Sequence, residues 1–415
     1  MANVEIARYG KKFVQYFWDP MPTNENDSAP IWCLGRRYES SMAPSLPPSS
    51  VSRTSEVPSE ETSWDEAAPT EAKAEDGGWP VAFLDDFEAR FWFTYRSNFP
   101  AIARSQDPKA ASALSFAVRL RSQLAQADGF TSDTGWGCMI RSGQSLLANT
   151  LQILRCGRDF KPETHPKEQR EIVSLFADDP RAPFSIHKFV EYGASACGKH
   201  PGEWFGPSAT ARCIQELVKQ YDTGLRVYIR DGTEVYEDSF LKAAMTKSGE
   251  FQPTLVLMGV RLGIDRITPV YWEALKVALQ MPQSIGIAGG RPSSSHYFVG
   301  TQASWFFYLD PHFTRPALPL HTNVDEYTED ELASCHTRRL RRIHIEEMDP
   351  SMLIGFLMRD KDDWTAWKKA ISAVPGKAII HVADKEPSLT GTGYEREGAI
   401  DEVETFDTED DDAEL

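Results

Sequence analysis

One cysteine of the chain stands in surroundings that could make it reactive. Cys138 follows a Gly-Trp-Gly turn in the stretch TSDTGWGCMIRSGQ (131–144) and directly precedes a run with helical periodicity. Thiolate is the reactive form of cysteine, and the unpaired N–H groups at a helix start lower the pKa of a thiol. The pattern indicates a nucleophile, with a buried structural thiol as the alternative. A zinc site built from Cys138 and remote histidines is a weaker interpretation, because no second ligand lies nearby in the sequence.

The residues around Cys138 also predict how the turn and the helix are built. Gly135 and Gly137 allow a sharp turn, and Trp136 is expected to wall a cleft beside the thiol. Three residues upstream carry side-chain oxygens that could cap the helix: Ser132, Asp133 and Thr134. Downstream, apolar residues recur at helical spacing over 138–154 with Gly143 on the same face, which predicts an amphipathic helix packed closely on a neighbour.

A nucleophilic cysteine needs an imidazole within hydrogen-bond reach and a third group that orients it. Two of the nine histidines stand beside strand-like runs, His296 in SSSHYFVG and His312 in FFYLDPHF. Asp310 lies two residues before His312, so in extended chain both side chains point to the same side. A hairpin would instead bring Asp310 to His296. The residues alone leave both histidines open, and Asp-Pro-His is also compatible with a simple turn after a strand.

Short periodic runs outside this stretch predict the elements that must position these residues. Helices are predicted over 83–99, 112–127, 208–221 and 269–281. Strands are predicted over 224–229, 254–260, 296–300 and 305–309, the last two forming a hairpin. Because the helices and strands do not alternate as regular βαβ units, the expected fold class is α+β.

Composition and charge exclude several function classes. The 415 residues are 41% hydrophobic and 25% charged, as in globular proteins, and no run of about 18 apolar residues predicts a membrane-spanning helix. A net charge of −17 argues against general nucleic-acid binding. The six cysteines include no CxxC pair, and the first residues lack the pattern of a secretory signal. These features favour a reduced, cytoplasmic protein.

Local composition divides the chain into four segments. Residues 41–78 are rich in Ser, Pro and Glu and poor in large apolar residues, so a disordered insertion is expected. Residues 384–415 form an acidic tail that is also expected to be disordered. Residues 79–383 are predicted to form one folded body, on which the N-terminal segment 1–40 packs through its own apolar residues.

Long motifs in this body match one family of enzymes. They are FWFTYRSNFPAI (91–102), the cysteine stretch 131–144, EWFGPS (203–208), MPQSIGIAGGRPSSSHYFVG (281–300) and FYLDPHF (307–313). With these motifs the chain resembles the autophagins, the autophagy-related cysteine proteases, and the resemblance covers most of residues 30–382. The resemblance implies a papain-like α+β catalytic domain with a small auxiliary insertion.

The resemblance also implies roles for individual residues. In autophagins the cysteine of GWGC and the Asp and His of DPH are catalytic, which implies Cys138, Asp310 and His312 here. Tyr95, the tyrosine of FTYR, would stabilise the oxyanion together with the backbone N–H of Cys138. His296 would then be a structural neighbour of the site and not the base.

For substrate binding, the resemblance implies a loop over the empty active site, a narrow slot and a docking surface. The loop corresponds to residues 288–293. The implied substrate-binding residues are Gly289, Gly290, Arg291 and Pro292 of this loop, Trp136 and Trp204 at the slot, and Arg261 and Ile264 on the docking surface. Neither a cofactor nor a metal is implied.

The implied reaction is cleavage after the C-terminal glycine of a GABARAP-type ubiquitin-like modifier. Cleavage would mature the precursor and would also release the modifier from phosphatidylethanolamine, so the enzyme would contact autophagic membranes through its lipidated substrate. Nucleic acid is not an implied partner. The alternative is a non-catalytic partner that binds ubiquitin-like modifiers, which the presence of every catalytic position disfavours.

Overall fold

The computed structural model describes residues 21–24, 28–40, 76–107, 109–110, 112–115, 118–119, 129–291 and 294–387. Most of the predicted insertion (41–75) and most of the predicted acidic tail (388–415) lie outside these residues. Of the helix predicted over 112–127, residues 112–115 form a turn and a bend instead, residues 118–119 are helical, and the others lie outside the described part.

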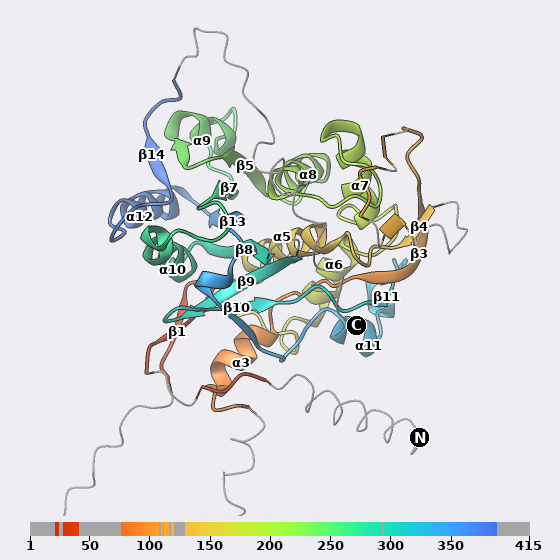
Figure 1. Ribbon diagram of the computed structural model, residues 1–415, viewed down its shortest axis with the longest axis horizontal. Helices are drawn as coiled ribbons and strands as arrows, with labels where there is room; N and C mark the ends of the chain where they lie inside the picture. Colours follow the sequence, from red (N-terminus) through yellow and green to blue (C-terminus); the bar gives the residue numbers. More distant parts are fainter. Residues whose placement is uncertain are drawn as a thin grey trace, which may run out of the picture.

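A nine-stranded sheet runs through the centre of the described structure (Figure 1). Its main path is β12 (Arg341–His344), β10 (Trp305–Leu309), β9 (Ser294–Gln302), β8 (Ser284–Arg291), β13 (Ser351–Met358), β7 (Thr254–Arg261) and β5 (Arg226–Asp231). The N-terminal strands β1 (Ile31–Cys33) and β2 (Arg36–Tyr38) join it beside β9. Neighbours on the main path pair antiparallel except β5 and β7, which are parallel.

Alternate residues of the central strands bury into two separate cores. In β7, Leu255 and Leu257 face one core, whereas Val256 and Met258 face the other. A strand covered on both faces reads as a continuous apolar run, which is why 254–260 was predictable as a buried strand. Helices pack against these strand residues and complete each core.

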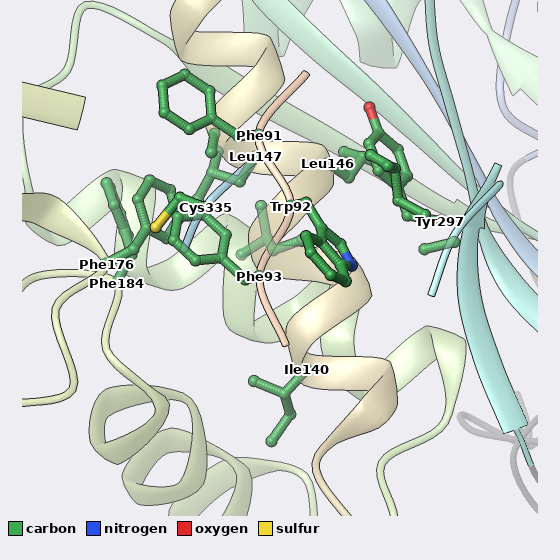
Figure 2. Close-up of a cluster of buried hydrophobic side chains, with 14 of the residues drawn as sticks. Phe91, Trp92, Phe93, Ile140, Leu146, Leu147, Phe176, Phe184, Tyr297 and Cys335 are labelled. Carbon is green, nitrogen blue, oxygen red and sulfur yellow. The ribbon is translucent and has the colours of Figure 1, made fainter. Parts of the chain in front are cut away.

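Helices cover both faces of the sheet. One face carries α5 (Cys138–Cys156), α6 (Pro166–Leu175), α7 (Ile186–Ala196) and α8 (Pro207–Gln220), and the other carries α9 (Glu237–Ala244), α10 (Trp272–Gln280) and α12 (Lys361–Ser372). Helix α5 is buried along nearly its whole length. Figure 2 shows Phe93, Phe176 and Phe184 gathered beside it in the first core.

Shorter elements complete the described structure. A second sheet contains β11 (Arg315–Pro316), β3 (Arg96–Ala103) and β4 (Gly129–Ser132), and a third pairs β14 (His381–Ala383) with β6 (Glu234–Tyr236). The remaining helices are α3 (Val81–Glu88) and α11 (Glu329–Ala333). Three 3₁₀ turns span Pro269–Tyr271, Val324–Glu326 and Ile345–Glu347.

The helix predicted over 83–99 is wrong beyond Glu88. The chain leaves α3 and runs extended into β3, because α5 supplies partners for its backbone. Phe91 N–H donates to Asn149 Oδ1 at 3.0 Å, and Phe93 N–H donates to Ser145 Oγ at 3.0 Å. Side chains of α5 therefore replace the intrahelical hydrogen bonds that periodicity alone predicted.

The other long elements were predictable. The α5 prediction is confirmed and continues to Cys156, and the predictions 208–221 and 269–281 correspond to α8 and to a 3₁₀ turn followed by α10. A Cβ added to Gly143 would lie 2.5 Å from Thr210 Cγ2, so this glycine does permit close packing of α5 on α8. The hairpin of β9 and β10 and the α+β class are also confirmed.

Candidate active site

Asp133 shapes the turn before Cys138. Its backbone carbonyl accepts hydrogen bonds from Trp136 N–H at 3.1 Å and Gly137 N–H at 2.9 Å. A Cβ on Gly137 would lie 2.4 Å from Asp133 Oδ2, so only glycine fits against this carboxylate. The prediction that one of the side chains at 132–134 caps the helix is wrong, because the start of α5 has no side-chain cap bond.

The Asp133 carboxylate is instead committed to two other donors. It accepts from Arg96 N–H at 2.6 Å and from Arg141 Nε at 2.7 Å. Arg141 also lies 2.8 Å from Asp178, and all three charged side chains are buried. A buried charge is stable only with partners of good geometry, so these contacts tie the start of α5 to β3. Tyr95 immediately precedes that strand.

The structure brings Cys138, His312 and Asp310 together. Cys138 is 2% exposed and hydrogen-bonds the His312 side chain. His312 Nδ1 lies 2.6 Å from Asp310 Oδ1, and the same oxygen accepts from His312 backbone N–H at 3.0 Å. With Nδ1 engaged by the carboxylate, Nε2 is the nitrogen that remains for the thiol. The arrangement matches a nucleophile, a base and an orienting acid.

The ionised forms of Cys138, His312 and Asp310 stabilise one another. Burial raises the pKa of Cys138, but the hydrogen bond and the charge of His312 outweigh burial and leave the pKa below its ordinary value of 9.0. Burial lowers the pKa of His312, whereas hydrogen bonds to Asp310 and Cys138 raise it to about 9. Burial also opposes ionisation of Asp310, and the bond from His312 nevertheless lowers its pKa to about 2. The resting site therefore favours a thiolate beside an imidazolium.

The second histidine considered from the sequence also reaches Asp310. His296 Nε2 lies 3.7 Å from Asp310 Oδ1, and its ring centroid lies 5.0 Å from that of His312. His296 is buried and packs edge-on against Tyr308 at 4.5 Å. The hairpin of β9 and β10 thus gathers both histidines around one carboxylate, as each sequence alternative required. Of these two histidines, His312 is the one that hydrogen-bonds the thiol.

Further donors surround the sulfur of Cys138. Tyr95 hydrogen-bonds the thiol through its phenol, and burial raises the pKa of Tyr95 far above the ordinary value, so it stays a donor. The backbone N–H of Ser295 and the side chain of Trp204 also lower the pKa of the thiol. Tyr95 is held at the site because its backbone N–H donates to Pro311 O at 2.8 Å. These donors favour negative charge on sulfur or on a nearby oxyanion.

Two serines at the site were missed by sequence reasoning. Ser294 Oγ lies 3.0 Å from His312 Nε2, and Ser295 Oγ lies 3.1 Å from Ser142 Oγ on α5. The signal available was the run of serines just before His296, at the start of a predicted strand. Its meaning depended on where the hairpin docks on α5, which spacing in the sequence does not contain.

The predicted covering loop needs correction over its first four residues. Residues 288–291 belong to β8, with Gly289 opposite His296 and Gly290 opposite Ser295, and Pro292 lies outside the described residues. A Cβ on Gly289 would lie 2.9 Å from Met352 Cβ, so this glycine serves packing on β13. The antiparallel ladder therefore extends almost to the turn and leaves only residues 292–293 between the strands.

The tryptophans predicted at the slot differ in their surroundings. Trp136 is 2% exposed, donates to Ser132 O at 3.1 Å and packs edge-on against Phe130, so it braces the turn from within. Trp204 is only partly buried, and its side chain lowers the pKa of Cys138. Of the two, Trp204 is the less buried.

Arg261 and Ile264 lie together where β7 ends. Arg261 donates to Ser351 Oγ at 2.8 Å and to Ile264 O at 2.7 Å, while the Ile264 side chain is 79% exposed. Only β13 separates the ends of β7 and β8, and two strand spacings amount to about 10 Å. The exposed Ile264 thus lies at the same end of the sheet as the end of β8 and the start of β9.

Within the described part of the chain, no helix is long and apolar enough to cross a membrane. The α+β body with a thiol at the start of a buried helix and a His–Asp pair on the adjoining sheet defines a papain-like thiol peptidase. Residues 80–370 match the family model described as the peptidase C54 catalytic domain. The chain belongs to the peptidase C54 family, which confirms the resemblance to the autophagins drawn from its motifs.

Similar proteins align over their full lengths. The chain is 62% identical to "Probable cysteine protease atg4" of Sclerotinia sclerotiorum, over 100% of both chains. It is 63% identical to the protein of the same name from Botryotinia fuckeliana, over 99% of each. It is also 53% identical to "Cysteine protease atg4" of Emericella nidulans, over 98% of each.

Proposed function

We propose that this thiol protease cleaves after the C-terminal glycine of a GABARAP-type ubiquitin-like modifier of autophagy. Its two reactions are maturation of the modifier precursor and release of the modifier from phosphatidylethanolamine. The observation that carries the proposal is the contact of Cys138 with His312, whose other ring nitrogen lies 2.6 Å from Asp310. The chain also aligns over nearly its whole length with a relative named cysteine protease atg4, and this alignment supports the same substrate class.

The geometry supports a definite role for each group. Cys138 thiolate attacks the glycine carbonyl carbon, and the former carbonyl oxygen takes up the negative charge, stabilised by Tyr95 O–H and the backbone N–H of Cys138. His312 then protonates the departing amine as the carbon–nitrogen bond breaks. Water hydrolyses the thioester, with His312 taking its proton, and the Cys138 thiolate is released beside the imidazolium. Asp310 holds the imidazole in orientation throughout.

The surfaces proposed to bind the substrate lie at the end of the sheet where β7 and β8 end. Ile264 is exposed and Arg261 orders the backbone beneath it, so this corner is suited to bind the folded body of the modifier. Trp204 and the β8–β9 hairpin flank the thiol, so an extended tail must pass between them. A glycine at the scissile position suits such a passage because it has no side chain. Binding energy from the body then positions the tail.

Incubation with a modifier precursor tests the proposal. Wild type should release the residues beyond the glycine, whereas Cys138→Ala should bind the precursor without cleaving it. The matched pair His312→Ala and His296→Ala should lose activity severely only at His312. Cleavage by Cys138→Ala, or a larger loss at His296, would show that the assignment is wrong.

Two further measurements separate the finer parts of the proposal. Vesicles carrying the modifier on phosphatidylethanolamine test delipidation, and they also test whether the enzyme contacts membranes through its lipidated substrate. Ile264→Asp should raise KM for the whole precursor at least about tenfold, because an exposed apolar anchor is lost, with little effect on a short tail peptide. An inert wild type that still binds the modifier would favour the non-catalytic alternative.

A further inference from the structure

Three side chains of the active site gather ligand atoms on the side of His312 that faces away from the thiol. Asp310 Oδ1 lies 2.6 Å from His312 Nδ1 and 3.7 Å from His296 Nε2. All three ligand atoms lie within 4.8 Å of one another. Two imidazole nitrogens with one carboxylate oxygen form the kind of ligand set that holds zinc with one position open.

The protein holds this cluster on rigid elements. His296 lies on β9 and is 5% exposed, with Tyr308 of β10 packed against its ring. The backbone of Asp310 is fixed because its carbonyl accepts from Trp92 Nε1 at 2.6 Å. The side chains of Asp310 and His312 are 20% and 27% exposed, which leaves an approach from solvent. An ion could therefore reach ligands that are already in place.

We propose that Zn²⁺ binds reversibly to His296 Nε2, Asp310 Oδ1 and His312 Nδ1, with water in the fourth position. On binding, the hydrated ion loses all but one of its waters as the three side chains take their places, and His312 Nδ1 releases its proton to solvent. Tetrahedral zinc with bonds of about 2.1 Å separates its ligand atoms by about 3.3 Å. The Asp310–His312 pair must therefore open by less than about 1 Å, and His296 must approach slightly.

Zinc at this position would inhibit the peptidase. A neutral imidazole has one nitrogen with a lone pair and one that carries hydrogen. If Nδ1 of His312 gives its lone pair to the metal, Nε2 must carry the hydrogen. His312 can then neither take the proton of Cys138 nor form the imidazolium that stabilises the thiolate. The inhibition needs no contact between zinc and sulfur.

Binding is best measured in Cys138→Ala, because the substitution removes the thiolate as a competing ligand and stops turnover. Titration calorimetry with Zn²⁺ should show one site, and Co²⁺ should give ligand-field absorption without a sulfur charge-transfer band. Adding His296→Gln should weaken binding at least about tenfold. His344→Gln is the matched control, because His344 is a partly exposed histidine whose nearest acid is Glu346 at 3.6 Å.

Asp310→Asn in the same background provides a second variant if His296→Gln fails to fold. It should also weaken Zn²⁺ binding, because an amide is a poor zinc ligand. Loss of binding in either folded variant, with His344→Gln unaffected, supports the site. Failure of Cys138→Ala to bind Zn²⁺, or equal binding by all folded variants, overturns it. The first of these results would place any zinc inhibition on the Cys138 sulfur.

The proposal does not depend on the identity of the substrate. Calorimetry requires no turnover, so a wrong modifier assignment would leave the metal result intact. In wild type, Zn²⁺ should also block hydrolysis of any substrate that the enzyme cleaves, and a chelator should restore it fully. Inhibition that a chelator does not reverse would contradict a reversible site.

Discussion

Replacing His312 with glutamine tests the ion pair at the active site, since glutamine is polar and similar in size but carries no charge. In wild type, burial raises the pKa of Cys138, and the bond and charge of His312 bring it below 9.0. Without the imidazolium, the smaller contributions of Ser295 and Trp204 are left to oppose burial. The pKa should then exceed 9.0. The thiolate fraction at pH 7 would fall below about 1%, because each pKa unit is a factor of ten.

The assay is alkylation of Cys138 by iodoacetamide from about pH 5 to about pH 10, read from its own peptide by mass spectrometry. Wild type should show a midpoint below 9.0 and the variant a midpoint above it. At pH 7 the alkylation rate should drop in step with the thiolate fraction. Cys156, a half-buried thiol at the far end of α5, is the internal control and should be unaffected. Equal rates at pH 7 in both proteins would refute the ion pair.

Two further predictions concern stability. Asp133→Asn should lower the free energy of unfolding by about 2 kcal/mol, because Arg141 keeps only Asp178 as a charged partner. The measurement is chemical denaturation, and an unchanged denaturation midpoint would mean that Asp178 alone satisfies Arg141. Burial lowers the pKa of His336 to about 4, below its ordinary 6.5. Between these two pH values the unfolded chain binds a proton that the folded chain does not, so the free energy of unfolding falls as the pH drops through this range. His336→Gln should reduce that loss by up to about 3 kcal/mol when the free energies of unfolding at pH 7 and at about pH 4 are compared; identical losses in both proteins would contradict it.

Elements that carry their own pattern were predictable from the sequence. Helix α5 combines a turn, an apolar face and Gly143 within one continuous stretch, and β7 is a run of apolar residues. The hairpin of β9 and β10 follows from two short strands with a polar turn between them. Each of these signals is local, so the elements that place Cys138 and Asp310 could be deduced without the fold.

Features that depend on contacts between distant segments were not predictable. Residues 89–95 have helical periodicity, yet their backbone bonds go to Asn149 and Ser145 of α5. Spacing also could not decide between His296 and His312, because both reach Asp310 and the choice depends on how the hairpin docks on α5. Sequence reasoning attributed the reactive thiol to the helix start, and the fold adds His312, whose hydrogen bond and charge also lower the pKa of the thiol.

A single buried arginine links the three segments that form the active site. Arg141 pairs with Asp133, whose Oδ1 accepts the N–H of Arg96, the residue after Tyr95. Arg141 also pairs with Asp178, whose other oxygen accepts from Leu318 N–H at 2.8 Å, in the segment that follows His312. The turn before the nucleophile, the strand beside the oxyanion donor and the chain after the base therefore meet at one guanidinium. Because a buried charge requires its partners in place, the network makes correct assembly of the active site a condition of a stable fold.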